Sequence, residues 1–390
     1  MAIQHALINK DTLKLICDTR NVTTEYISRI TNHTAVRIER WMSPQDPLLP
    51  TIRQAKDLAR CLGIPFAGLY VDPESVPIAK LPKLVDKRTM PGGIPRDDSA
   101  VNLAVFDLLR LRTIVLDTKR ELGDSAIRFA YTGKLDGARE LALQLRTYLG
   151  VSYALQKAAS SPRQFFLLVR GKIEEKGILV AGFAGVDVEA VRGMALYFDE
   201  LPVIGINNLD RPPAKTFSML HELVHILKRC SASCNQIGLS PTSDRDEIFC
   251  NAVAGEFLVP AGLLGQEVEV RTGDIDDQAI RALAARYSVS REVISRRLLD
   301  LGYIQKLDYE EIMEVLRAQL AAEQNRSKSL DLSKYRRNVA REALDKNGMS
   351  LCKLLQRGID REIYSRQDVG DFLGVRLKHI SHLLAEAGRW

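Results

Sequence analysis

Residues 217–228 read Phe-Ser-Met-Leu-His-Glu-Leu-Val-His-Ile-Leu-Lys, and the chemistry of the chain starts from this stretch. It contains the pattern His-Glu-x-x-His at 221–225, with apolar residues at helical spacing on both sides. On a helix, the two imidazoles lie four residues apart on one face, with the side chain of Glu222 beside them. The stretch therefore predicts a helix that chelates a metal ion through His221 and His225.

A catalytic zinc site usually has three protein ligands and leaves the fourth position to water, so a third ligand is needed. Residues 246–260 predict a second helix that ends at Pro260 and has Glu247 in its first turn. The small side chains of Cys250 and Ala254 share a face with Glu247 and allow a close approach to the first helix. We therefore expect the carboxylate of Glu247 to be the third ligand.

These two segments resemble the ImmA/IrrE-type metallo-endopeptidases, whose pattern is H-E-x-x-H followed by E-x-x-A-N-x-F-A-x-x-L-L-x-P. The similarity extends upstream to residues 201–207 and downstream to residues 289–298, and covers about residues 160–305. It implies that His221, His225 and Glu247 bind zinc and that Glu222 is the general base. The chain departs from the family at Val224, where Gly is frequent, and at Cys250, where Ala is usual.

The resemblance also implies the mechanism, in which zinc polarises water and the scissile carbonyl while Glu222 moves the proton from the water to the leaving amine. The strand that ends at Asn207 is a candidate edge for an extended substrate. We expect Cys250 and Asn251 close to the ligands. Ligands of this type accept Zn²⁺ or Mn²⁺, so the metal stays open. The candidates for stabilising the oxyanion are Tyr197, Asn207 and Tyr287.

The rest of the chain is divided by its polar and Gly/Pro-rich segments. We predict an Xre-like helix-turn-helix domain at 1–85, a linker at 86–100, a zinc metallopeptidase domain at 101–320 with its core at 160–305, and a basic helical domain at 321–390. Apolar periodicity predicts helices at 100–123 and 135–149. Short aliphatic runs predict strands at 165–169, 178–181, 194–198 and 203–206. The fold class is α+β, mostly helical, with a small sheet in a zincin-like peptidase domain.

Residues 23–41 fit two short helices joined by a turn at Asn32 and His33, and they resemble an Xre or lambda-repressor domain, with residues 52–63 similar to its closing helix. If the second helix enters a major groove, Thr34, Arg37 and Arg40 are the residues that contact double-stranded DNA. A packing or partner-binding module is the alternative. The candidate core positions are Ile27, Ile30, Val36, Ile38 and Trp41.

The net charge of +6 is concentrated at the ends of the chain, because residues 325–390 hold 14 Lys and Arg against 8 Asp and Glu. Residues 365–384 repeat the two-helix rhythm, with Gly374 at the turn. The excess charge favours phosphate contact. The same pattern fits a dimerisation unit, so a homodimer is the alternative.

The start of the chain lacks the pattern of a signal peptide, and no apolar run is long enough to span a membrane, so we expect a cytoplasmic protein with free thiols and no membrane contact. The resemblance to the ImmA/IrrE-type peptidases implies a regulatory zinc hydrolase, an endopeptidase that cleaves or controls a repressor or a toxin-antitoxin partner. The alternative is a DNA-binding regulator or antitoxin with a structural or idle metal site.

Overall fold

The computed structural model describes residues 4–76, 85–86, 98–125, 128–234, 245–269, 275–329 and 338–388. Its contacts divide the chain into two compact units. Unit 1 consists of Met1–Lys83, Met90–Leu111 and Phe183–Val186, and unit 2 consists of Leu84–Thr89, Arg112–Gly182 and Asp187–Trp390. The division into three domains and a linker that the sequence suggests stays a prediction.

Unit 1 is built from short helices around its own apolar core, in which Leu13, Ile27, Ile38 and Trp41 are fully buried. Asn9, Thr23, Thr34 and Thr51 each accept a backbone N–H at the start of a helix, so the sequence supplies a side-chain cap for each of the first four α-helices. The helices are α1 (Lys10–Arg20), α2 (Thr24–Thr31), α3 (Ala35–Met42), α4 (Ile52–Leu62), the 3-10 helices η1 (Phe66–Leu69) and η2 (Pro73–Ser75), and the part of α5 (Ser99–Glu121) that ends at Leu111.

Helices α2 and α3 are each eight residues long and are joined through Asn32, which has the left-handed φ of 57°. The predicted core positions are correct for Ile27, Ile38 and Trp41. They are wrong for Ile30 and Val36, whose exposed fractions are 52% and 66%. Val36 lies about 200° around α3 from Ile38, so the two side chains cannot share one face. In α2 the buried residues are Tyr26 and Ile27 of the first turns.

Unit 2 contains a mixed sheet with the strand order β1-β5-β3-β4-β2. Its central strand β3 is antiparallel to both neighbours, with Gly193 paired to Ile206 of β4 and to Cys234 of β5. Every residue of β2, β3 and β4 is buried, as expected for a sheet covered on both faces. The strands are β1 (Val85–Asp86), β2 (Leu179–Phe183), β3 (Gly193–Leu196), β4 (Val203–Asn207) and β5 (Ala232–Cys234).

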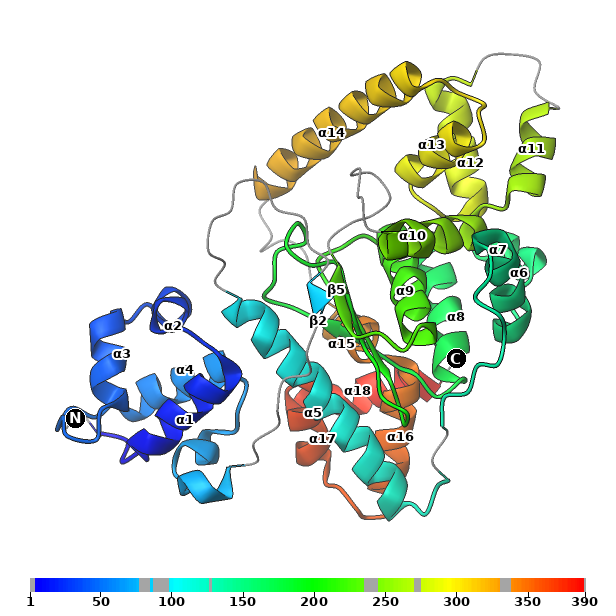
Figure 1. Ribbon diagram of the computed structural model, residues 1–390. Coiled ribbons are helices and arrows are strands. Elements are labelled where there is room, and N and C mark those ends of the chain that lie inside the picture. Colours follow the sequence, from blue (N-terminus) through cyan, green and yellow to red (C-terminus); the bar gives the residue numbers. More distant parts are fainter. Residues whose placement is uncertain are drawn as a thin grey trace. The chain divides into compact units, whose positions relative to one another are not determined.

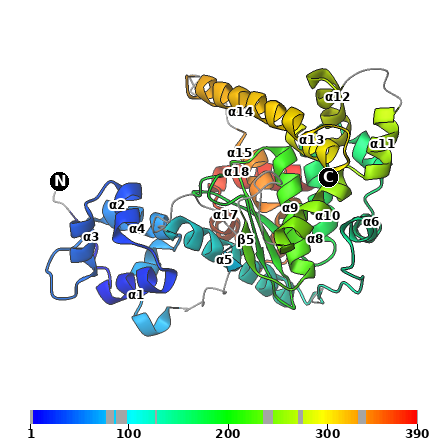
Figure 2. The ribbon, with the colours of Figure 1, turned by 45° about the horizontal axis from the view of Figure 1, so that its top comes forward.

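One face of this sheet is covered by α9, which packs on β3 and β4 and contacts α8 and α10 on its other sides, as both views of the ribbon show (Figures 1 and 2). Helix α10 also packs against α6. The helices of this part of unit 2 are α6 (Ala138–Leu149), α7 (Tyr153–Ala158), α8 (Pro162–Glu174), α9 (Pro212–Leu227), α10 (Arg245–Leu258), α11 (Ala261–Glu269), α12 (Asp277–Tyr287), α13 (Arg291–Asp300) and α14 (Lys306–Ser329).

The strand predicted at 165–169 is wrong, because these residues lie in the middle of α8. Ser161 caps the helix by accepting the N–H of Gln164, and Pro162 occupies its first turn, where its fixed φ is favourable. The buried residues continue to Val169 and Ile173 at helical spacing. The bulky run 165–169 is therefore the buried side of a helix, which periodicity over five residues does not distinguish from a strand.

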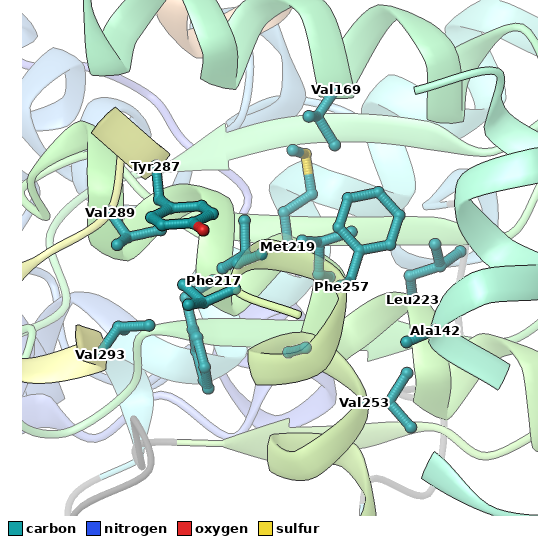
Figure 3. Packing of buried hydrophobic residues seen from close by; sticks show 14 of the residues in the cluster. Ala142, Val169, Phe217, Met219, Leu223, Val253, Phe257, Tyr287, Val289 and Val293 are labelled. Carbon is teal, nitrogen blue, oxygen red and sulfur yellow. The ribbon is translucent and has the colours of Figure 1, made fainter. Parts of the chain in front are cut away.

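The core of unit 2 lies where these helices meet, and Figure 3 shows part of it around Phe217 and Met219 of α9. Phe257 of α10 and Tyr287 at the end of α12 belong to the same cluster. Four further helices follow: α15 (Val339–Asn347), α16 (Met349–Asp360), α17 (Arg366–Leu373) and α18 (Leu377–Gly388). Unit 2 thus combines many helices with one small sheet, and the predicted α+β, mostly helical class is confirmed.

Within the described ranges, no single helix is long and apolar enough to cross a membrane. By length and composition alone, one bent pair, Arg245–Leu258 with Ala261–Val268, meets the requirement.

Candidate metal centre

Helix α9 holds three buried ionisable side chains among mostly apolar neighbours. Pro212 lies in its first turn, and every residue from Thr216 to Leu227 is buried, so the helix is a core element. His221, Glu222 and His225 are each only 1% exposed. Because buried polar groups need partners, these three side chains point to a site with a specific function.

Glu247 in the first turn of α10 meets both histidines of α9. Its Oε2 lies 3.2 Å from Nε2 of His221, and its Oε1 lies 3.1 Å from Nε2 of His225. The two Nε2 atoms are 3.2 Å apart. The two Nε2 atoms and the carboxylate group of Glu247 therefore form a triangle, in which each histidine faces a different carboxylate oxygen.

This triangle fits a tetrahedral zinc ion. Tetrahedral ligands at zinc–ligand distances of about 2.0–2.1 Å lie roughly 3.3 Å from one another. The three separations of 3.1–3.2 Å match that value within the normal spread. In addition, two imidazole nitrogens with lone pairs this close repel each other unless a cation or a proton lies between them. The residues present thus fit a divalent metal.

Helix α10 also contacts the outer nitrogens of both imidazoles. The Nδ1 of His221 is 2.9 Å from Oδ1 of Asn251, so an Nδ1–H donates to the amide oxygen and Nε2 keeps its lone pair for a metal. The Nδ1 of His225 is 3.9 Å from Sγ of Cys250. Asn251 and Cys250, both expected near the ligands, are therefore placed against the ligand histidines.

Cys250 also makes a second candidate ligand set, because its sulfur and one nitrogen of each histidine all lie within 4.8 Å of one another. The geometry favours Glu247 over Cys250 as the candidate third ligand. The oxygens of Glu247 lie 3.1–3.2 Å from the Nε2 atoms of the two histidines, whereas the sulfur lies 3.9 Å from the Nδ1 of His225.

Glu247 is ionised in this environment. In the metal-free protein, burial alone would raise the pKa of Glu247, but hydrogen bonds donated by protonated Nε2 atoms of His221 and His225 outweigh the desolvation and hold the pKa well below its usual value. A carboxylate at this position can balance part of the charge of a divalent cation.

The predicted oxyanion candidates have partners away from the two histidines. The Tyr197 hydroxyl donates to Asp199 Oδ1 at 2.9 Å, and the Tyr287 hydroxyl donates to Glu267 Oε1 at 3.3 Å. Asn207 donates from Nδ2 to the Val191 carbonyl at 2.8 Å.

The proposal that the strand ending at Asn207 is a free edge for substrate is wrong. That strand, β4, lies between β3 and β2. Asn207 itself is completely buried, and it ties the end of β4 to the segment before β3.

Three buried side chains that the sequence did not single out fix the end of α10. Arg146 donates to the carbonyl of Phe257, Gln156 to that of Leu258 at 3.0 Å, and Arg297 to that of Val259 at 3.0 Å. The last carbonyls of a helix have no partner within the helix, so these bonds satisfy them. They hold in place the helix that contributes Glu247. No local pattern could reveal them, because the donors come from α6, α7 and α13.

The three candidate DNA contacts in unit 1 differ in their surroundings. Thr34 caps α3, accepting the N–H of Arg37 at 3.3 Å. Arg40 pairs with Asp46 at 2.7 Å while remaining half exposed. Arg37 is exposed.

Comparison with known proteins identifies one family. Residues 174–299 match the family model of the IrrE N-terminal-like domain, peptidase family M78. No curated protein matches the chain. The matched segment contains β2 to β5 and α9 to α13, except for the last residue of α13. It therefore includes all three candidate ligands. The resemblance to an Xre domain at the start of the chain stays a prediction.

Proposed function

Because residues 174–299 form a domain of the ImmA/IrrE metallopeptidase family, we propose that the protein is a zinc-dependent endopeptidase of regulatory type that acts in the cytoplasm. The observation that carries the proposal is the meeting of three side chains: the Nε2 atoms of His221 and His225 lie 3.2 Å apart, and each lies 3.1–3.2 Å from one of the two carboxylate oxygens of Glu247. Glu222 lies on the same helix turn and is not part of the triangle. Metal-assisted peptide hydrolysis needs three protein ligands and a nearby carboxylate that can act as the base.

Each residue of the site has a separate role in the proposed reaction. When bound, zinc supplies the positive charge that polarises the attacking water and the scissile carbonyl. Glu222 accepts the proton that the water loses and donates it to the leaving amine nitrogen, while the hydroxyl joins the acyl carbon. His221, His225 and Glu247 hold the ion, and Asn251 keeps the ring of His221 in the tautomer that binds through Nε2.

The substrate we propose is a repressor or an antitoxin-like protein. Support comes from the chain itself, which joins the peptidase domain to a small helical unit with the two-helix arrangement of α2 and α3. A peptidase fused to such a unit is suited to a partner that works on DNA.

The test compares the zinc-loaded protein with the zinc-loaded Glu222→Gln variant. Each is incubated with extract of the host cell, and new protein N-termini are labelled and identified. We expect the wild type to generate new termini in one or a few proteins and the variant to generate none, with zinc content equal in both. An identical set of termini from both proteins would show that Glu222 is not the base.

A second candidate function is a DNA-binding regulator in which the metal is structural or idle. The observation that favours it is the exposed second helix α3, whose Arg37 is exposed beside Val36. A gel-shift titration with DNA from upstream of the gene tests it. Removing a phosphate contact by Arg37→Ala should lower the slope of log affinity against log salt by about one, whereas Arg60→Ala on α4 should leave it unchanged. DNA binding equal in the wild type and Glu222→Gln, without any cleavage product, would favour this reading.

A further inference from the structure

Gly193 opens the central strand of the sheet and faces the helix that carries the metal ligands. It pairs with Ile206 on one side and with Cys234 on the other, so the sheet fixes the direction in which a side chain here would point. Residues two apart in a strand share a face, and Ala195 on the same face is fully buried. Two small residues therefore lie under α9, which packs on β3.

A side chain at position 193 would occupy the space of Glu222. A Cβ placed on Gly193 would lie 2.5 Å from Oε1, 2.8 Å from Cγ and 3.0 Å from Cδ of Glu222. Such distances are well inside the van der Waals contact of about 3.5–4.0 Å between carbon atoms. The clash includes Cγ, so turning the carboxylate about its last bond would not relieve it. The side chain would have to adopt another rotamer.

Glu222 has little room for such a change. It is 1% exposed, and the whole of α9 around it is buried. Tightly packed interiors transmit a displacement rather than absorbing it. A methyl group at position 193 would therefore move the carboxylate away from its present place.

The backbone gives no other reason for glycine at this position. Gly193 is not among the described glycines with positive φ, so alanine could adopt its conformation. Within a strand, alanine is ordinarily the more stable of the two residues, because glycine loses more conformational freedom on folding. The close approach of Glu222 is therefore the remaining reason for a glycine at position 193.

We infer that Gly193 is a positioning residue for the general base: the missing side chain at this point of β3 leaves the space that holds the Glu222 carboxylate beside the metal ligands. The inference rests on the proposed function for the role of Glu222. The contact between Gly193 and Glu222 itself does not depend on that role.

The first experiment measures the contact without any metal. Thermal unfolding is followed for the chelator-treated wild type, Gly193→Ala, Glu222→Ala and the double variant. We expect Gly193→Ala to lower the unfolding midpoint of the wild type by a few degrees, and to leave the midpoint unchanged or higher in the Glu222→Ala background. An equal loss in both backgrounds would overturn the inference, since the methyl group would then clash with something else.

The second experiment measures the position of the carboxylate. The protein is loaded with Co²⁺, and the visible spectrum is titrated with pH. A carboxylate near the Co²⁺ ion influences the pH at which the visible spectrum changes. Glu222→Gln should therefore shift the midpoint of this pH titration. We expect Gly193→Ala to shift it in the same direction, and Gly193→Ala combined with Glu222→Gln to match Glu222→Gln alone. Gly171→Ala, where a Cβ meets no neighbour within 4 Å, is the matched control and should leave the curve unchanged.

The outcomes distinguish failure of the proposed metallopeptidase function from failure of the positioning role of Gly193. If the wild type binds no Co²⁺, the proposed function fails, while the unfolding experiment still decides whether Gly193 makes room for Glu222. If Co²⁺ binds and Gly193→Ala leaves both the content and the titration unchanged, the metal site stands and the positioning role is overturned.

Discussion

At the candidate metal centre, the approach of the Glu247 carboxylate to both histidines makes Glu247 the first choice for the third ligand, and Cys250 is the other candidate. We predict that Glu247→Ala abolishes stoichiometric zinc binding, because two imidazoles alone leave the ion short of a protein ligand. Elemental analysis of purified protein gives the zinc content per chain.

Cys250→Ser is the matched control, because it changes the other candidate ligand, one turn further along α10. We expect it to keep one zinc per chain. The opposite pattern, with zinc lost from Cys250→Ser and retained by Glu247→Ala, would make the cysteine the ligand.

Asn251 orients a ligand without binding the metal itself. We predict that Asn251→Leu weakens zinc affinity by about 10–100-fold, since the Nδ1 of His221 loses its acceptor. Asn251→Asp keeps an oxygen at the same place and should retain most of the affinity. Competition with a fluorescent zinc chelator measures both. Equal affinities in all three proteins would remove Asn251 from the site.

Local spacing was enough to predict part of this site. The His-Glu-x-x-His pattern places its own members, and positions 250 and 251 follow Glu247 by three and four residues, which puts them on one helix face. Gly193 could not be predicted in this way. Its role depends on the pairing of β3 with two strands and on the packing of α9, and neither is visible in a single stretch of sequence.

At the scale of elements, the end of α10 depends on side chains from other helices. Gln156 of α7 is 1% exposed, donates to the carbonyls of Leu258 and Tyr287, and accepts from Arg146. We predict that Gln156→Ala lowers the free energy of unfolding by about 2–4 kcal/mol, because buried partners lose their bonds. Urea unfolding measures the change.

Gln367→Ala on α17 is the control for this prediction, because Gln367 is exposed and bonds only a neighbour on its own helix, Asp371. It should change the unfolding free energy by less than about 0.5 kcal/mol. A similar loss in both variants would show that the buried network is unimportant.

The first turn of α13 makes stability depend on pH. Burial raises the pKa of Glu292 to about 7, with Asp210 adding to the rise and Arg192 and Arg317 opposing it. An unfolded glutamate titrates near pH 4.3, so the native state holds an extra proton between these values. The contribution to stability is therefore complete below about pH 4 and is lost as the pH rises through 7.

Glu292→Gln tests this linkage, because the amide cannot ionise. The variant should have a flatter dependence of unfolding free energy on pH between about 4 and 7, and its unfolding free energy should exceed that of the wild type by up to roughly 3.5 kcal/mol at pH 8. Urea unfolding at several pH values provides the comparison. Parallel curves would mean that Glu292 titrates normally.

Helices could be predicted from the sequence where the apolar periodicity extended over many residues. The helices at 100–123 and 135–149 correspond to α5 and α6, and three of the four predicted strands correspond to β2, β3 and β4. The exception, α8, has its start signal at Ser161 and Pro162, outside the apolar run that was read as a strand. A short run of large apolar residues fits either structure, and packing against α9 selects the helix.

At the scale of the molecule, the two units have separate apolar cores, and the candidate metal ligands all belong to unit 2. We predict two calorimetric unfolding transitions for protein freed of metal. Added zinc should raise the midpoint of one transition only, because a ligand stabilises the part that binds it in the folded state. In the His221→Ala variant, added zinc should change the midpoint of neither transition. A shift of both midpoints in the wild type would show that the units unfold together.

The helix α10 presents a ligand at 247 and the partners of both imidazoles at 250 and 251 within a little more than one turn. Because these contacts come from one short segment of helix, the segment tolerates substitutions better than changes in its length. A substitution removes one of these contacts, but inserting or deleting a single codon between 247 and 250 would rotate the later positions by about 100° relative to the earlier one. All natural variation in this segment should therefore preserve its length, whatever happens to its individual residues.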